Sequence, residues 1–482
     1  MLIRILITLI IISFIILCSI HPFLWLLINH EMKLTPGSKL YTNWLQSSIP
    51  IIIEFYFFNL TNPFEFENGA KPILKQIGPY TYSIKYYKVN IKHNYDNGTI
   101  EYNERKEYYF NRTLSIGSEL DIINHINIGY VSVAMQMNSS LWLIDYLIEF
   151  IEKQRQYQLF SKRTIKELLW GYHDEFLSFL SKYGINIPTT EIGILLHHNN
   201  TLSNSILIND GLRNQKRIGE ILQYNGSNHL NYWQTTIANM INGTDGTIYH
   251  TYMNKYDKPY IFLYDLCRSI QLNWYAYSQL NNLPVYQYIL SEDTFKSGRN
   301  YVINKGFCIN WPNCYYDGVL DMSTCQMNSP VVISQPHFIN ADKSYQDAVE
   351  GIQPTNEEYN TTIYVEPTTG IIISAQSKLQ INLVIRNTQK FQQLSHISNV
   401  LLPLVFFNES INLNVSTINE LNMKINQIPN IIYIISMFSM IFNILLLCLI
   451  QLKSYLQNRC YQQVNEENEA LLRNHEENST KH

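Results

Sequence analysis

The longest apolar runs of the chain lie near its two ends. Residues 5–28 are apolar, with His21 and Pro22 as interruptions, and residues 431–450 carry no charge. A helix needs roughly 20 apolar residues to cross a bilayer, so the pattern predicts transmembrane helices over residues 5–28 and 431–451. A cleaved signal peptide is the alternative for the first run, but that run is long for a signal and no small-residue cleavage site follows it.

Flanking charges give an orientation for the two predicted spans. Arg4 precedes the first span, and Lys453 and Arg459 follow the second. Cytosolic flanks are enriched in Lys and Arg, so residues 1–4 and the tail 452–482 are predicted to be cytosolic, and residues 29–430 to form a lumenal or extracellular domain. Cations on the opposite flanks weaken this asymmetry: Lys33, Lys39 and Lys424.

Glycosylation sequons support the same orientation, because the pattern Asn-x-Ser/Thr is concentrated between the spans. Asn478 also fits the pattern but lies in the predicted cytosolic tail, where it should stay unmodified. The candidate glycosylation sites are Asn59, Asn97, Asn111, Asn138, Asn199, Asn225, Asn242, Asn360, Asn408 and Asn414.

Four of the seven cysteines fall in the region between the spans: Cys267, Cys308, Cys314 and Cys325. An even number in an oxidising compartment predicts two disulfides, with three possible connectivities. A zinc site is the alternative, but the spacing lacks paired C-x-x-C knuckles. The other cysteines lie in the spans or the tail: Cys18, Cys448 and Cys460.

Alternation of apolar and polar positions predicts strands over residues 51–58 and 80–89. Two pairs of residues, Gly78 with Pro79 and Asn97 with Gly98, are typical of turns. Beyond residue 190 the pattern again indicates short strands and turns through residue 416. No repeat or low-complexity linker divides this region, so one domain is expected.

Apolar residues at helical spacing predict a first helix that begins at Ser139. A second helix is predicted to begin at Thr164 and to continue to about residue 180. Thr164 and Glu167 match a capping box. The two helices are expected to form a hairpin, and a basic cluster lies along their connection. This cluster is either solvated helix surface or a binding face for anionic ligands. The candidate ligand-binding residues here are Leu141, Ile144, Leu147, Ile148, Lys153, Arg155, Lys162, Arg163 and Lys166.

Charge and motif content exclude several functions. The chain has a net charge of -4 and so lacks the excess of basic residues that binding to nucleic acids requires. No nucleophile elbow, HExxH, P-loop or dinucleotide pattern is present, so we expect neither an enzyme nor a cofactor or metal. A two-span ion channel is another class with this topology. Its pore would need polar residues in the spans, and only Ser436, Ser439 and Asn443 qualify.

The tail carries a short motif that resembles an acidic dileucine sorting signal, the kind read by clathrin adaptors. Glu467 stands four positions before Leu471 and Leu472 in a polar segment that we expect to be disordered. A chance leucine pair in a frayed helix is the alternative. Cys460 is a weaker candidate for palmitoylation.

Several segments together resemble the class B scavenger receptor family, and they occur in that family's order. The resemblance extends from one predicted span to the other. The segments are residues 55–63 (FYFFNLTNP), 69–82 (GAKPILKQIGPYTY), 168–172 (LLWGY), 240–246 (MINGTDG), 265–269 (DLCRS), 306–308 (GFC), 336–338 (PHF) and 366–370 (EPTTG).

The resemblance implies an α+β fold: a large irregular antiparallel β-barrel with an apical helical bundle, flanked by two transmembrane helices. An apolar tunnel runs through the barrel in this family. Residues 139–182 would belong to the apical bundle, where ligands dock. The implied disulfides join Cys267 with Cys325 and Cys308 with Cys314. Ala238 departs from the family, whose members commonly have a cysteine there.

The tail motif and the four-cysteine pattern are most similar to the lysosomal integral membrane protein branch. That branch implies a location in lysosomal or late endosomal membranes, a lysosomal hydrolase as a possible partner, and lipid ligands such as sterol, fatty acid or phospholipid. A plasma-membrane lipid receptor is the alternative. If cargo is released in an acidic organelle, His125 or His173 near the apex could gain charge as the pH falls.

Overall fold

The computed structural model describes residues 1–47, 49–136, 146, 150, 157–355 and 357–479. It divides into two compact units. The first unit comprises Met1–His30 and Asn419–His482, and the second comprises Glu31–Ile418. The first unit thus holds the apolar ends of the chain, and the second holds the four paired cysteines.

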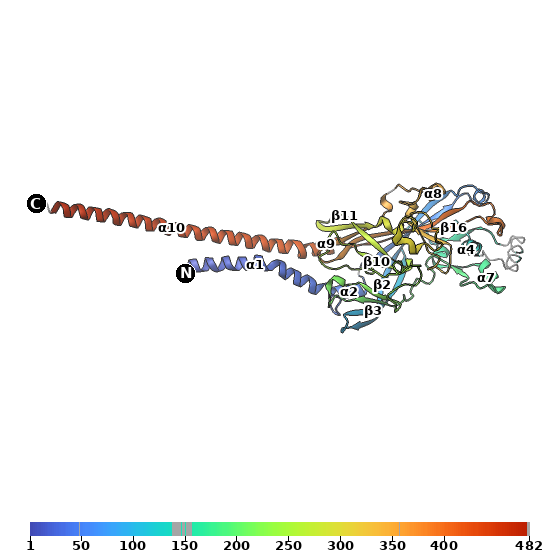
Figure 1. Ribbon diagram of the computed structural model, residues 1–482, viewed down its shortest axis with the longest axis horizontal. Helices are drawn as coiled ribbons and strands as arrows, with labels where there is room; N and C mark the ends of the chain where they lie inside the picture. Colours follow the sequence, from blue (N-terminus) through green and yellow to red (C-terminus); the bar gives the residue numbers. More distant parts are fainter. Residues whose placement is uncertain (48, 137–145, 147–149, 151–156, 356, 480–482) are drawn as a thin grey trace. The chain divides into compact units, whose positions relative to one another are not determined.

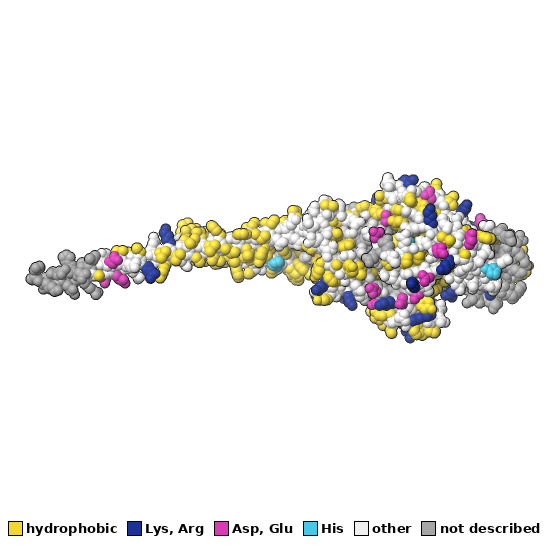
Figure 2. Space-filling model, turned by 90° about the horizontal axis from the view of Figure 1, so that it is seen from above, with side chains coloured by type: hydrophobic (Ala, Val, Ile, Leu, Met, Phe, Trp, Pro, Cys, Tyr) yellow, Lys and Arg dark blue, Asp and Glu magenta, His cyan; other side chains and the backbone are white. Residues whose placement is uncertain are grey.

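The first unit consists mainly of two long helices, α1 (Leu2–Glu31) and α10 (Ile428–Ser479) (Figure 1). Both are long and apolar enough to cross a membrane. Hydrophobic side chains cover much of their surface (Figure 2), as expected for helices that face lipid.

Polar side chains within these helices contact each other. The Ser13 hydroxyl of α1 donates to the Ser439 hydroxyl of α10 at 3.0 Å, and the Asn443 amide donates to the Ser439 carbonyl at 2.7 Å. Small hydroxyl residues commonly join helices in membranes in this way. Two of the three residues that the channel hypothesis requires thus take part in contacts within the helical unit.

Helix α10 continues far beyond the predicted span, through Ser479. The expectation of a disordered tail was therefore wrong. The physical reason lies in composition: the sequence contains no glycine or proline after Pro429, and Gln, Glu, Leu and Lys favour helix.

The second unit is built on a 13-stranded antiparallel sheet, in which the main strand order is β10-β11-β12-β15-β16-β17-β1-β2-β3-β8-β9. Strands β13 and β14 extend it from β16. The strands are β1 (Ile51–Leu60), β2 (Leu74–Asn94), β3 (Thr99–Phe110), β8 (Ile206–Asn209), β9 (Ile221–Tyr224), β10 (Tyr260–Leu263), β11 (Arg268–Leu280), β12 (Leu283–Leu290), β13 (Val319–Asp321), β14 (Val331–Ser334), β15 (Thr362–Glu366), β16 (Ile371–Ile385) and β17 (Val400–Asn412).

The sheet closes almost into a barrel, because one short segment bridges its two edge strands. The backbone N–H of Ile221 in β9 donates to the Gly243 carbonyl at 2.8 Å, and Phe262 in β10 donates to the Thr244 carbonyl at 2.9 Å. Gly243 has φ +84°, and a Cβ there would lie 2.0 Å from the carbonyl oxygen of Tyr260. Only glycine fits this position, which gives the MINGTDG segment a role in barrel closure.

Strands β1 and β2 confirm the strand predictions for residues 51–58 and 80–89, and Asn97 and Gly98 lie in the turn between β2 and β3. Gly78 and Pro79 do not form a turn, however. They lie inside β2, joined by a cis peptide bond, where the β1–β2 register shifts. A bulge can accommodate a proline that donates no ladder hydrogen bond.

The remaining elements include two small hairpins and several short helices. The hairpins pair β4 (Ile122–Ile126) with β5 (Phe160–Thr164) and β6 (Tyr172–His173) with β7 (Glu191–Ile192). The helices are α2 (Lys39–Leu45), α3 (Pro63–Glu67), α4 (Ile128–Gln136), α6 (Ile165–Trp170), α7 (Glu175–Lys182), α8 (Lys343–Asp347) and α9 (Val415–Asn422).

The helix predicted from Thr164 to about residue 180 is two helices. Its start is confirmed, because the Thr164 hydroxyl and the Glu167 carboxylate form the expected capping box. It ends at Gly171, which has φ +115°, and a new helix α7 begins after Asp174, whose carboxylate caps it. Glycine favours helix termination, so the break has a local cause.

Candidate functional site

The apical candidate residues are only partly within the described structure. Six of the nine lie outside it: Leu141, Ile144, Leu147, Ile148, Lys153 and Arg155. The described members are on different elements, since Lys162 and Arg163 belong to strand β5 and Lys166 lies in the first turn of helix α6. The connection that we expected between two helices therefore ends in a strand paired with β4.

Among the described basic residues of the apex, Arg163 is engaged in packing. Its guanidinium lies 4.2 Å from the centre of the Tyr172 ring, and it pairs with Glu167 at 3.9 Å. Lys162 and Lys166 are exposed. Arg163 therefore stabilises the β5–α6 junction, while the two lysines are accessible to a ligand.

The two histidines considered as pH sensors differ in environment. His125 is buried, and its Nδ1 lies 2.7 Å from the Ile126 carbonyl oxygen. Burial, reinforced by the nearby charge of Arg163, lowers the pKa of His125 to about 4. This downward shift argues against His125 as the switch. The His173 ring is exposed, and its Nε2 lies 2.6 Å from the Ser178 hydroxyl.

The four cysteines of the second unit form two disulfides. Cys267 is joined to Cys325 with a Cα–Cα distance of 6.4 Å, and Cys308 to Cys314 with 5.2 Å. These are the pairs that the family resemblance implies. The two bridges are close to each other, since Arg268, which follows Cys267, lines one cavity together with Cys308 and Cys314.

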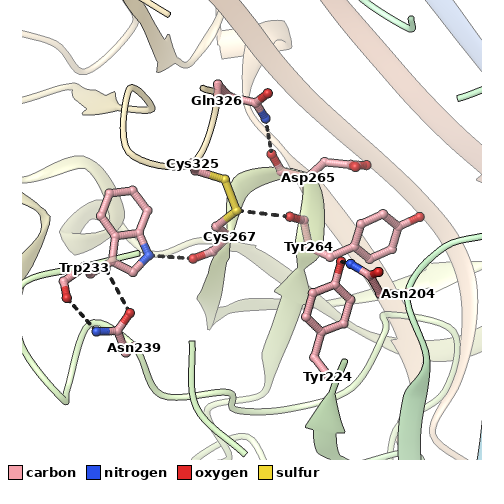
Figure 3. Close-up of a disulfide and its surroundings, with 9 residues drawn as sticks. All are labelled: Asn204, Tyr224, Trp233, Asn239, Tyr264, Asp265, Cys267, Cys325 and Gln326. Atoms are coloured by element: carbon pink, nitrogen blue, oxygen red, sulfur yellow. Dashed lines mark hydrogen bonds between the residues drawn. A yellow bond between two sulfur atoms is a disulfide. The ribbon is translucent and has the colours of Figure 1, made fainter. Parts of the chain in front are cut away.

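Figure 3 shows how the Cys267–Cys325 bridge is anchored. The indole N–H of Trp233 donates to the Cys267 carbonyl at 2.6 Å, and Asn239 accepts from and donates to the Trp233 backbone. Next to Asn239 is Ala238, which is buried against Gly306. Position 238, where members of the family commonly have a further cysteine, is thus occupied here by a small, packed alanine side chain.

A buried group of charges connects the barrel strands to the bridging segment, and sequence reasoning missed it. Lys88 of β2 lies 3.3 Å from Glu104 of β3 and 2.8 Å from Asp245. Tyr102 donates to Asp245 at 3.0 Å, and Tyr264 donates to Glu104 at 3.2 Å. We call these five residues the Lys88 cluster.

Within the Lys88 cluster, Lys88 and Asp245 favour each other's charged state. Burial lowers the pKa of Lys88, but attraction to Asp245 and Glu104 outweighs it and leaves the pKa raised. Burial likewise raises the pKa of Asp245, and the Lys88 charge reverses this, so the net shift is downward. Paired, ionised groups of this kind tie structural elements together.

A second lysine, Lys106, is partly buried and faces Tyr264, a member of the Lys88 cluster. The Lys106 ammonium is positioned over the rings of Tyr86 and Tyr264 at 5.1 and 4.9 Å, and lies 3.8 Å from Asp265. The Tyr86 hydroxyl donates to Glu409 of β17 at 2.7 Å. Of these buried and partly buried charged residues, only Asp245 and Asp265 lie in segments that resemble the family, so only these two could have been singled out from the sequence.

The candidate glycosylation sites fall into distinct environments. Asn97, Asn199, Asn225 and Asn414 are exposed, whereas Asn138 lies outside the described residues. Asn408 is half-buried in β17, where its side-chain nitrogen donates to Glu54 at 2.9 Å. Asn59, Asn111, Asn242 and Asn360 are also only partly exposed.

The tail motif lies on helix α10, which includes Glu467, Leu471 and Leu472. The three cysteines outside the second unit, Cys18, Cys448 and Cys460, are exposed thiols. An exposed Cys460 is compatible with acylation, as we expected from its position after the span.

The second unit is a nearly closed antiparallel barrel, and the first holds two helices that are long and apolar enough to cross a membrane. The model of the CD36 family matches residues 3–453. The chain therefore belongs to the CD36 family, that of the class B scavenger receptors.

Individual relatives cover most of the chain. Lysosome membrane protein 2 of Mus musculus is 34% identical over 421 residues, which is 86% of this chain and 87% of the relative. The Homo sapiens protein of that name is 32% identical over 421 residues, with the same shares covered. Scavenger receptor class B member 1 of Rattus norvegicus is 31% identical over 405 residues, 84% of this chain and 79% of the relative.

Proposed function

We propose that this protein is a lipid-binding receptor of lysosomal and late endosomal membranes. Its two apolar helices would span the membrane, with residues 1–4 and 452–482 in the cytosol and the barrel in the lumen. The observation that carries the proposal is the similarity to lysosome membrane protein 2 over most of both chains, combined with the barrel between two apolar helices.

Lipid is the proposed ligand class, in the form of a sterol, a fatty acid or a phospholipid. A barrel lined in part by apolar side chains can take up a lipid because each Å² of apolar surface removed from water contributes about 25 cal/mol. No energy-coupling motif is needed for such transfer. A lysosomal hydrolase docked at the apex is a further proposed partner, and two of the candidate basic residues, Lys162 and Lys166, are exposed there.

Lysosomal delivery would depend on clathrin adaptors that recognise Glu467, Leu471 and Leu472. All three residues belong to the long helix α10. An adaptor that binds the motif in an extended form would require the last turns of the helix to unwind. The free energy needed is small at a helix end, because terminal turns fray.

A plasma-membrane receptor is the second candidate, because scavenger receptor class B member 1 is nearly as similar to this chain. The two locations are distinguished by imaging the tagged full-length protein. We expect the wild type in lysosomes and a Leu471→Ala, Leu472→Ala variant at the cell surface. The matched control is Gln462→Ala, Gln463→Ala, which alters the same tail and should stay lysosomal.

If wild type and variant both reside at the plasma membrane, the lysosomal proposal is wrong and the surface receptor replaces it. If both reside in lysosomes, the tail motif is not the signal. Surface biotinylation measures the same distribution quantitatively and is independent of the tag.

A further inference from the structure

A cavity of about 130 Å³ lies beside the Cys308–Cys314 disulfide. Three cationic side chains line it, Arg268, Lys296 and Arg386, against one carboxylate, that of Asp321. We call it the Arg268 cavity. Two of the family-like segments, residues 265–269 and 306–308, contribute to its lining.

Arg268 is the buried member of this set, with only 7% of its surface exposed. One terminal nitrogen donates to the Thr294 carbonyl at 2.6 Å, and the other donates to the Asn304 side-chain oxygen at 3.0 Å. The guanidinium lies 3.8 Å from the centre of the Phe307 ring. Its Nε–H is also buried and has no acceptor among the residues that the structure describes.

All of these contacts are to neutral groups, so the positive charge of Arg268 is not balanced by them. Burial alone lowers the pKa of Arg268 to about 9, and no described carboxylate acts against this effect. A buried charge without a counter-ion is costly in free energy. The Lys88 cluster of the same unit shows the usual solution, in which carboxylates surround the buried cation.

The cationic residues at the rim add to the positive potential. Arg386 is exposed and donates to the Tyr315 hydroxyl at 3.4 Å. Lys296 is partly neutralised by Asp293 at 2.6 Å. Asp321 accepts a hydrogen bond from the Ser323 amide. An anion that enters the cavity would therefore meet more positive than negative charge.

We propose that the Arg268 cavity binds a small oxyanion, namely a phosphate group. A guanidinium offers planar, directed donors that match phosphate oxygens. The volume is sufficient, because one water needs roughly 10–15 Å³ of such space. It is well below the roughly 300 Å³ of the smallest usual sites for larger organic ligands. A phosphate group fits, whereas a sterol or an acyl chain does not.

The phosphate could be free or could be the head group of a lipid whose tails lie outside the cavity. This inference is independent of the proposed lysosomal function, since it rests only on the charges and volume beside Cys308–Cys314. Either source would neutralise Arg268 and stabilise the fold around both disulfides.

The test uses the full-length protein purified in an uncharged detergent. Titration with sodium phosphate, at an ionic strength held constant with sodium chloride, is followed by calorimetry and by thermal unfolding. We expect saturable binding in the wild type. Arg268→Met should weaken it by about 10- to 100-fold, the effect of losing hydrogen bonds to a charged group.

Two further variants keep the experiment decisive if Arg268→Met does not fold. Lys296→Met combined with Arg386→Met changes exposed residues and should weaken phosphate binding by roughly 2- to 10-fold. Arg217→Met, which removes an exposed arginine paired with Glu220 outside the cavity, should leave it unchanged.

The absence of saturable phosphate binding in the wild type would overturn the proposal. So would binding that both the Arg268 variant and the double rim variant retain in full. A second titration with glycerol phosphate and with dihexanoyl phosphatidic acid identifies the source. Binding of these esters supports a lipid head group, and binding of inorganic phosphate alone supports a free anion.

Discussion

Replacing Lys88 with methionine should destabilise the barrel strongly, because it leaves two carboxylates buried without their cation. The side chains of Lys88 and Glu104 are only 5% and 7% exposed, and Asp245 is 11% exposed. Removing one partner from a buried ion pair costs about 3–5 kcal/mol. With an unfolding entropy of about 2.1 cal/mol/K per residue, this lowers the Tm of a unit the size of Glu31–Ile418 by roughly 4–6 °C.

The same hairpin offers a matched control. Lys92 of β2 pairs with Glu101 of β3 at 3.4 Å, nearly the Lys88–Glu104 distance, but its side chain is 75% exposed. An exposed pair contributes about 0–1 kcal/mol, so Lys92→Met should shift the Tm by about 1 °C or less. Burial is therefore the variable that separates the two substitutions.

The assay is thermal unfolding of the detergent-solubilised full-length protein, followed by intrinsic fluorescence at one fixed scan rate. Lys88→Met combined with Asp245→Asn should recover part of the loss, because the uncompensated charge is then reduced. Equal, small shifts for Lys88→Met and Lys92→Met would refute the reasoning, since they would mean that water reaches the Lys88 cluster.

Three further predictions concern other parts of the second unit. Gly243→Ala should abolish folding and retain the protein in the endoplasmic reticulum, because the added Cβ would lie 2.0 Å from the Tyr260 carbonyl oxygen. The control is Gly226→Ala, at φ +75° with open space around it, which should lower the free energy of unfolding by only about 1 kcal/mol. Asn97→Gln and Asn225→Gln should each increase gel mobility by one glycan, whereas Asn408→Gln should not, because its nitrogen donates to Glu54. Burial lowers the pKa of His337 to about 4, so the unfolded chain takes up the proton first, and His337 alone should contribute about 2 kcal/mol to the stability lost between pH 7 and pH 5. His337→Gln should reduce this slope by that amount. An unchanged slope in His337→Gln would contradict the pKa assignment.

Features that depend on a short stretch of sequence were predictable. The two apolar helices follow from composition, β1 and β2 from alternation, and the start of α6 from the Thr164–Glu167 pair. The division of the predicted second helix also had a local signal, since Gly171 and Asp174 are typical of a helix end and a helix start.

Features that depend on distant residues were not predictable from pattern alone. Lys88 and Asp245 are separated by 157 positions, and alternation cannot show that the MINGTDG segment reaches β2. Gly78 and Pro79 have the composition of a turn, but their role depends on the bulge opposite Phe55 and Phe57. The Arg268 cavity likewise needs residues from several loops, and no single stretch of sequence reveals that the arginine lacks a carboxylate.

The most direct test of lipid binding is photo-crosslinking of the full-length protein in membranes with a diazirine-bearing sterol, followed by mass spectrometry of the labelled peptides. We predict labelled peptides from Glu31–Ile418, reduced by an excess of unlabelled sterol. Labelling confined to α1 and α10, and unaffected by competition, would show only membrane contact and would contradict the assignment of the barrel as a lipid receptor.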